Sequence, residues 1–167
     1  MRTKIIFQSI DFFFIITIAI TAIFLLTNRN YFSVPDPDIF QYIDDGRQYL
    51  HFKLPQNIQA PPIHSILIVF IALFLRSFRY PEILSAHFIN IFSAIIFLGL
   101  IYYLLRSYSR FIGLLVVLLL VTNPLFIFSS LNVNSEVLFT MTTIAAMLLY
   151  QKNQFTRAYA VAGSSFL

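Results

Sequence analysis

Carboxylates are scarce in this chain, and four of its seven acidic residues fall between residues 36 and 45. Asp38 is the one that we single out in this cluster. Far along the chain, Glu136 follows the sequence Asn-Val-Asn-Ser. A carboxylate can act as a general base or as a ligand for a hard cation such as Mg²⁺. Asp38 and Glu136 are therefore the candidate catalytic residues and the candidate metal ligands.

The composition indicates the surroundings in which these acids act. The chain is 59% hydrophobic and 17% aromatic, and only 11% of its residues are charged, against about 25% in soluble proteins. We therefore predict an integral membrane protein. The net charge of +4 comes from lysines and arginines that stand singly or in loose pairs between apolar runs, so there is no basic face to bind nucleic acid. The absence of cysteine excludes disulfides, cysteine-bound zinc and a thiol nucleophile.

The apolar runs predict an all-α fold, a polytopic transmembrane helix bundle, because about 20 apolar residues are needed for each spanning helix. We expect four crossings and the start of a fifth near residue 158, which we take as a sign that the chain is the truncated N-terminal portion of a longer protein. A cleaved signal peptide is the alternative for the first run, but no small-residue cleavage site follows it. The crossings are at about residues 5–26, 83–105, 111–128 and 137–150, with an external loop at 28–82.

A shorter apolar run at residues 63–75 decides the topology. Runs of this length are more often interfacial than spanning. If it does not cross, Arg106 and Arg110 join Lys152 and Arg157 in the cytoplasm, together with the N-terminus, as the positive-inside rule favours. If it crosses, Arg106 and Arg110 lie outside. We prefer the first arrangement, which keeps every acid except Asp11 outside.

The external segment has a helical pattern from Asp38 onward, which predicts an amphipathic helix lying on the membrane. Asp36 before Pro37 is typical of a helix N-cap, which leaves Asp38 in the first turn, where the helix dipole favours its ionised form. One face of the helix is apolar or aromatic and comprises Ile39, Tyr42, Ile43, Gly46, Tyr49 and Leu50. The other face is polar and comprises Gln41, Asp44, Asp45 and Gln48, of which we expect both aspartates to be solvated.

The remaining polar residues allow structural as well as functional interpretations. Glu136 could simply favour the start of a helix that Asn134 or Ser135 caps. The three histidines, at positions 51, 64 and 87, form no metal-binding pattern, and His64 is the one with a possible role because it lies outside. Asp11 is the only acid within a crossing and has no obvious partner in the sequence.

These residues carry a resemblance to a known family. The motif Pro37-Asp38-x-x-x-Tyr42 after a first crossing, with Pro61-Pro62 before a short apolar helix, resembles the first external loop of the GT-C superfamily of membrane glycosyltransferases. Within it, the chain looks most like aminoarabinose transferases and protein O-mannosyltransferases. The later Ser135-Glu136-Val-Leu-Phe139 is similar to the segment with that family's second external acid.

The resemblance implies a catalytic role for Asp38 and places Glu136 as the second acid. Because both acids are expected at helix starts on the same side of the membrane, with no basic neighbour close in the sequence, we also expect them to face one external, water-filled cavity. Tyr42, Arg47 and His64 are the expected substrate-binding residues, Arg47 as a weaker candidate for the donor phosphate. The chain departs from the pattern at Ile39, where many relatives have another acid, and at Ile63-His64, where many have Gly-Tyr or Leu-Tyr. These departures leave the sugar open. A divalent metal ion, Mg²⁺ or Mn²⁺, is the one cofactor that we consider.

The expected function is therefore transfer of a sugar from a polyprenyl-phosphate donor to a lipid, glycan or protein acceptor, outside a prokaryotic plasma membrane. We expect the chain to be inactive by itself because it is a fragment. One alternative is a non-catalytic membrane module that binds a lipid-linked glycan or a partner chain. The other is a transporter or flippase, for which acids paired across membrane helices are expected.

Overall fold

The computed structural model describes residues 2–28, 37–55, 61–132 and 135–166, and every regular element in these ranges is an α-helix. The predicted all-α fold is confirmed. The helices are α1 (Arg2–Asn28), α2 (Pro37–Leu50), α3 (Pro62–Phe74), α4 (Pro81–Leu105), α5 (Arg110–Thr122), α6 (Pro124–Leu131), α7 (Glu136–Gln151) and α8 (Phe155–Phe166).

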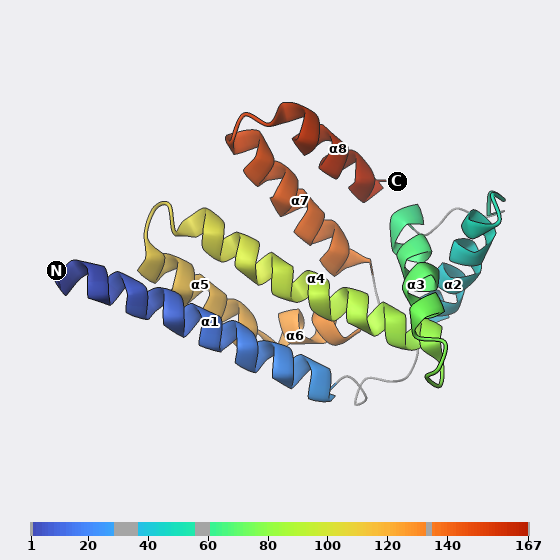
Figure 1. Cartoon of the computed structure of the whole chain (residues 1–167), viewed down its shortest axis with the longest axis horizontal. Helices are drawn as coiled ribbons and strands as arrows, with labels where there is room; N and C mark the ends of the chain where they lie inside the picture. The colour runs from blue at the N-terminus through green and yellow to red at the C-terminus, as the bar shows by residue number, and fades with distance from the viewer. Residues whose placement is uncertain (1, 29–36, 56–60, 133–134, 167) are drawn as a thin grey trace.

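The helices α1, α4 and α5 lie side by side along the length of the molecule, whereas α2 and α3 lie across one end (Figure 1). Helix α7 packs on α4 and forms an antiparallel hairpin with α8. The starts of α4 and α7 are at the end that holds α2 and α3. The turn between α4 and α5 and the turn between α7 and α8 lie at the other end.

Two helices are long and apolar enough to cross a membrane, α4 and the segment Ser9–Asn28 of α1, with mean hydropathies of 2.3 and 2.4. Large apolar side chains such as Phe12, Ile15 and Ile20 are exposed on α1, as suits a surface against lipid chains. The count rises to three if α5 and α6 together form one bent span. At 16 residues, α7 is shorter than the roughly 20 residues of a typical spanning helix.

The segment 111–128, predicted as one crossing, is two helices that meet at an angle of 67°. The break lies at Asn123, because the ring of Pro124 disfavours a helical conformation in the residue before it. Asn123 has an extended backbone (φ −76°, ψ 119°), and its side chain accepts a hydrogen bond of 2.9 Å from the Leu125 amide. Asn123 thus ends α5 and caps α6.

Close packing of α2 against α3 organises one end of the molecule. Helix α3 begins at Pro62, as the proline pair predicts. The α2 backbone approaches α3 at Gly46, where an added Cβ atom would lie 2.2 Å from the Ser65 carbonyl oxygen. Ile39 and Ile43 of α2 pack with Ile68 of α3 in a cluster that α4 completes.

The first helix is joined to α4 and α5 by a polar contact that the sequence did not reveal. Arg110 donates a 2.5 Å hydrogen bond to Asp11, and the Tyr102 hydroxyl donates another to the same carboxylate. The ring of Phe14 stacks on Tyr102 at a centroid distance of 3.9 Å. The expectation that Asp11 has no partner was therefore wrong. Its partners are 91 and 99 residues away along the chain.

Candidate functional site

Asp38 lies in the first turn of α2, as predicted, and its side chain is exposed. The next residue, Ile39, is fully buried in the cluster shared by α2, α3 and α4. This anchor fixes the helix start while Asp38 remains accessible. The predicted cap at Asp36 lies outside the described residues.

The polar face of α2 is only partly as predicted. Asp44 is exposed, but Asp45 is only 5% exposed, so the expectation that both are solvated was wrong for Asp45. The reason is its position beside Gly46, at the close approach of α2 to α3. Burial, with a smaller effect of Asp44, raises the pKa of Asp45. Within the described residues, neither Asp45 Oδ2 nor the buried Tyr49 hydroxyl has a hydrogen-bond partner.

His64, near the start of α3, is completely buried against Tyr42 of α2. The two rings are T-shaped, with their centroids 5.0 Å apart. Burial lowers the pKa of His64 to about 4, although the nearby side chain of Asn90 opposes the shift. Neither ring nitrogen has a partner with hydrogen-bond geometry in the described part of the chain. At neutral pH, His64 is therefore an uncharged imidazole with unused hydrogen-bonding capacity.

A small cavity of about 20 Å³ joins the start of α3 to the start of α7. It has room for one water-sized group. The His64 imidazole and Ser135 are both in its wall, so two segments that are 71 positions apart meet here. The full lining is Pro61, Ile63, His64, Ser135, Leu138, Phe139 and Thr142.

Glu136 lies in the first turn of α7 with an exposed side chain, as predicted. Ser135 occupies the N-cap position, but its side chain makes no capping hydrogen bond. The alternative predicted cap, Asn134, lies outside the described residues.

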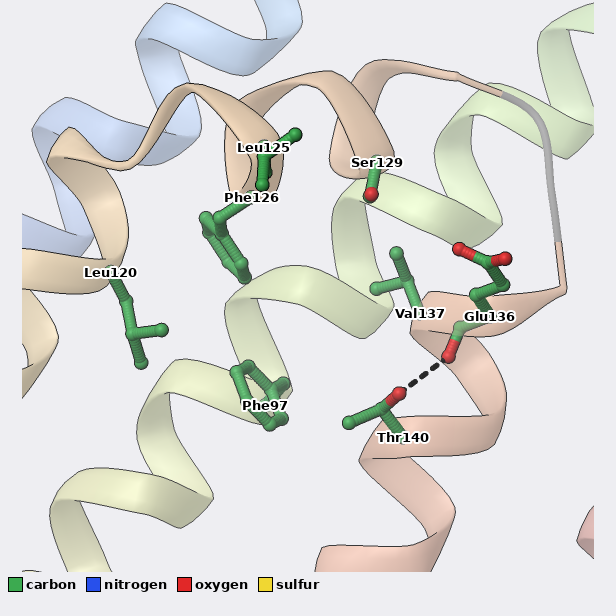
Figure 2. Close-up of a pocket in the computed structure, with 8 residues that line it drawn as sticks. All are labelled: Phe97, Leu120, Leu125, Phe126, Ser129, Glu136, Val137 and Thr140. Carbon is green, nitrogen blue, oxygen red and sulfur yellow. Dashed lines mark hydrogen bonds between the residues drawn. The ribbon is translucent and has the colours of Figure 1, made fainter.

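Glu136 also lines a cavity of about 240 Å³ between α4, α5, α6 and α7. Figure 2 shows its carboxylate on the same side of the cavity as Ser129 of α6, with the rings of Phe97 and Phe126 further along the wall. The wall is mostly apolar, with Leu120, Leu125, Val137 and Thr140 completing it. Asp38 is not among these lining residues, so a common cavity for both acids stays a prediction.

The two acids are nevertheless connected through the packing of their helices. The cluster that buries Ile39, next to Asp38, also receives Tyr42 of α2 and Leu138 of α7. Leu138 is two residues after Glu136 and lines the small cavity together with His64. The described contacts therefore bring the starts of α2, α3 and α7 to one end of the molecule (Figure 1).

Arg47, the weaker phosphate candidate, is held by two carboxylates. Its guanidinium donates a 2.6 Å hydrogen bond to Glu82 at the start of α4, and Asp44 lies 3.9 Å away. This ion pair links α2 to α4. A phosphate would have to compete with Glu82 for the same guanidinium group.

The buried polar side chains of α4 were not predicted as a group from the sequence. Ser85 donates a 2.7 Å hydrogen bond to the Ile68 carbonyl of α3, and Asn90 donates to the Asn132 carbonyl just beyond α6. Together with His87 they are buried polar residues within a helix that is otherwise largely apolar. Buried polar groups in an apolar helix are the signal that could have identified them.

The expected metal site has limited structural support. Among the described residues, no three or more His, Cys, Asp or Glu side chains are grouped so that they could hold a metal ion. Mg²⁺ is commonly bound through one or two carboxylates with water and substrate phosphate. Asp38 and Glu136 suit that mode by their chemistry, and the metal stays a prediction.

Comparisons of the chain with protein-family models, with curated proteins and with solved structures gave no match.

Proposed function

We propose that the protein is a membrane glycosyltransferase, which transfers a sugar from a polyprenyl-phosphate donor to a lipid, glycan or protein acceptor on the outer face of the membrane. The observation that supports this best is the position of Asp38, an exposed carboxylate at the start of α2 beside the buried anchor Ile39. The choice of a polyprenyl-phosphate sugar as the donor rests on the resemblance of the Pro37-Asp38-x-x-x-Tyr42 motif to the GT-C superfamily.

In the proposed reaction, Asp38 acts as the general base. Its carboxylate accepts the proton of the acceptor hydroxyl while that oxygen attacks the anomeric carbon of the sugar. The bond from the anomeric carbon to the phosphate oxygen breaks, and its electron pair leaves with the polyprenyl phosphate. A glycosidic bond of inverted configuration is formed. Because phosphate is already a good leaving group, this scheme needs no protonation of it by a general acid.

Other residues at this end orient the reactants. Glu136 accepts a hydrogen bond from the acceptor, and His64, neutral at physiological pH, binds a polar group near the small cavity. Tyr42 contacts the substrate beside His64. A divalent ion held by Asp38 and Glu136 would supply positive charge to the donor phosphate. Arg47 is a less favoured phosphate ligand because of its pairing with Glu82.

The topology that suits this function has α2 and α3 as interfacial helices outside, and the N-terminus in the cytoplasm. It also requires two further crossings in addition to the two helices that are long enough by themselves, one by the bent pair of α5 and α6 and one by α7. The polar residues that pack α2 and α3 onto α4, Arg47 with Glu82 and Ser85 with the Ile68 carbonyl, suit an interface position.

The substitution Asp38→Asn tests the proposal. The amide keeps the shape of the side chain but cannot accept the proton, and we expect sugar transfer in membranes to fall by about 100-fold to 10,000-fold. Asp44→Asn, an exposed change on the same helix, is the matched control and should retain activity. Normal turnover by Asp38→Asn, or equal loss in both variants, would contradict the role of Asp38. Donor binding without any transfer by the wild-type protein would favour the non-catalytic module.

A transporter is the second candidate, and one observation favours it: Asp11 is paired across helices with Arg110 and Tyr102. Asp11 is, however, only the third residue of the candidate span Ser9–Asn28. Substrate sites of transporters lie near the middle of the membrane. The position near one end suits a structural contact between helices better.

A further inference from the structure

A basic cavity lies at the end of the molecule away from α2 and α3, between the turn that joins α4 to α5 and the turn that joins α7 to α8 (Figure 1). We propose that it binds the phosphate headgroup of an anionic phospholipid from the adjacent leaflet. Its volume is about 460 Å³. Its lining is Tyr103, Leu104, Arg106, Ser107, Arg110, Leu148, Gln151 and Lys152. The inference is independent of the proposed transferase activity.

Two cations from different helices converge on one aromatic ring in this cavity. The guanidinium carbon of Arg106 lies 4.5 Å from the centroid of the Tyr103 ring, and the Lys152 ammonium lies 4.6 Å from the same centroid. Cation–π attraction holds each of them in place. The cavity therefore has two positive groups gathered at one aromatic ring.

These two charges are not neutralised by protein carboxylates in the described ranges. The third cation of the lining, Arg110, is paired with Asp11 at 2.5 Å. Neither Arg106 nor Lys152 forms an ion pair within the part of the chain that the structure describes. Two neighbouring positive charges repel each other, and an anion bound between them removes this cost. A phosphate can accept charge-assisted hydrogen bonds from both.

The surroundings favour a lipid over a soluble phosphate. Leu104 and Leu148 give the cavity apolar walls next to its basic groups. Helix α4, which ends here, is long enough to span the membrane, so the cavity lies at the level of lipid headgroups. Basic pockets between transmembrane helices are known to bind anionic headgroups. Positive residues that only set topology would not need a shared cavity.

The test is to measure binding of phosphatidylglycerol to the purified protein in neutral detergent by native mass spectrometry, with phosphatidylcholine as the uncharged comparison. The double variant Arg106→Gln/Lys152→Gln should bind phosphatidylglycerol at least about tenfold more weakly. The control is Arg76→Gln/Arg79→Gln, which removes the same charge from exposed positions between α3 and α4. Arg79 is a close match because it also lies over a tyrosine ring, at 5.0 Å. The control should bind like the wild type.

Equal weakening in both double variants would overturn the proposal, because attraction would then depend only on net charge. Equal binding of phosphatidylcholine, or displacement of the lipid by inorganic phosphate at matched concentration, would also overturn it. If the double variant loses its helical circular dichroism, the charge-preserving Lys152→Arg and the ring-deleting Tyr103→Leu replace it. Lys152→Arg should retain phosphatidylglycerol binding, and Tyr103→Leu should weaken it. Weaker binding by Lys152→Arg than by Tyr103→Leu would refute the site.

Discussion

At the scale of single residues, the end of the protein that holds α2 and α3 combines exposed acids with buried polar groups. Asp38 and Glu136 are exposed, whereas His64 is completely buried and Asp45 nearly so. Burial shifts the pKa of His64 downward and that of Asp45 upward, so both are biased toward their neutral forms. The charge available for chemistry at this end is thus concentrated on the exposed carboxylates.

The buried imidazole of His64 predicts a pH-dependent stability. Its folded pKa of about 4 lies below its unfolded value of 6.5. Between these values the unfolded chain binds more protons, so the free energy of unfolding falls as the pH is lowered through this window. The loss should approach roughly 3 kcal/mol at the acidic end. The raised pKa of Asp45 acts in the opposite direction, so the comparison must be made between variants.

Thermal unfolding in detergent at pH 7 and at pH 4.5 measures this effect. His64→Gln should reduce the difference in melting temperature between the two pH values. His51→Gln changes an exposed histidine and should leave the difference unchanged. If the wild type and His64→Gln show the same fall in melting temperature from pH 7 to pH 4.5, His64 is not buried in its neutral form.

At the scale of helices, the position of Asp38 depends on how closely α2 approaches α3. That approach is possible because Gly46 has no Cβ atom to meet the Ser65 carbonyl. The ion pair between Arg47 and Glu82 adds a second connection, from α2 to the start of α4. The helix that carries the proposed base is thus positioned by backbone contact, apolar packing and one ion pair.

The contact at Gly46 predicts that Gly46→Ala destabilises the protein. The new Cβ would lie 2.2 Å from the Ser65 carbonyl oxygen, so the helices must separate. We expect a loss of about 1–3 kcal/mol, typical of overpacking, together with reduced sugar transfer as Asp38 moves. Thermal unfolding and the transfer assay measure the two effects.

Gly99→Ala is the matched control for this substitution. Apart from the backbone of its own helix and its chain neighbours, no atom of the described residues lies within 4 Å of the Cβ position at Gly99, and alanine is the better helix former by about 1 kcal/mol. Stability should therefore stay equal or rise. If Gly46→Ala behaves like Gly99→Ala, the close approach of α2 and α3 is wrong.

At the scale of the whole molecule, the acids and the basic cavity lie at opposite ends of the bundle (Figure 1). Asp38 and Glu136 lie with α2 and α3 at one end, whereas Arg106 and Lys152 lie at the other. If the end with α2 and α3 faces outward, as we propose, Arg106 and Lys152 lie on the cytoplasmic side, where the positive-inside rule favours such residues. The contact of Asp11 with Arg110 then lies near the inner interface.

The orientation can be measured directly because the chain has no cysteine of its own. Single cysteines at Ser107 and Gln154, in the two turns of the basic end, should be shielded from an impermeant thiol reagent in intact cells. A cysteine at Lys53, exposed after α2, should be labelled. Labelling at position 107 would mean that α3 crosses the membrane or that the bundle is inverted.

The local features of the fold could be predicted from the sequence. Helix starts at Pro37 and Pro62 follow from the fixed φ of proline, and Asp38 and Glu136 were correctly placed in first turns. The break at Asn123 was also encoded locally, by Pro124, but the length of the apolar run concealed it. These features could be predicted because each depends only on a residue and its near neighbours in the chain.

The sequence by itself thus determined an apolar, helical chain with acids at particular helix starts. Only the tertiary structure decided which residues meet: Asp11 with Arg110, His64 with Tyr42, and Arg106 with Lys152 around one ring. It also decided that Asp45 is buried, because the neighbouring glycine lets another helix approach. Burial and pairing depend on the packing of helices that are distant in the chain, and no periodicity within one segment specifies that packing.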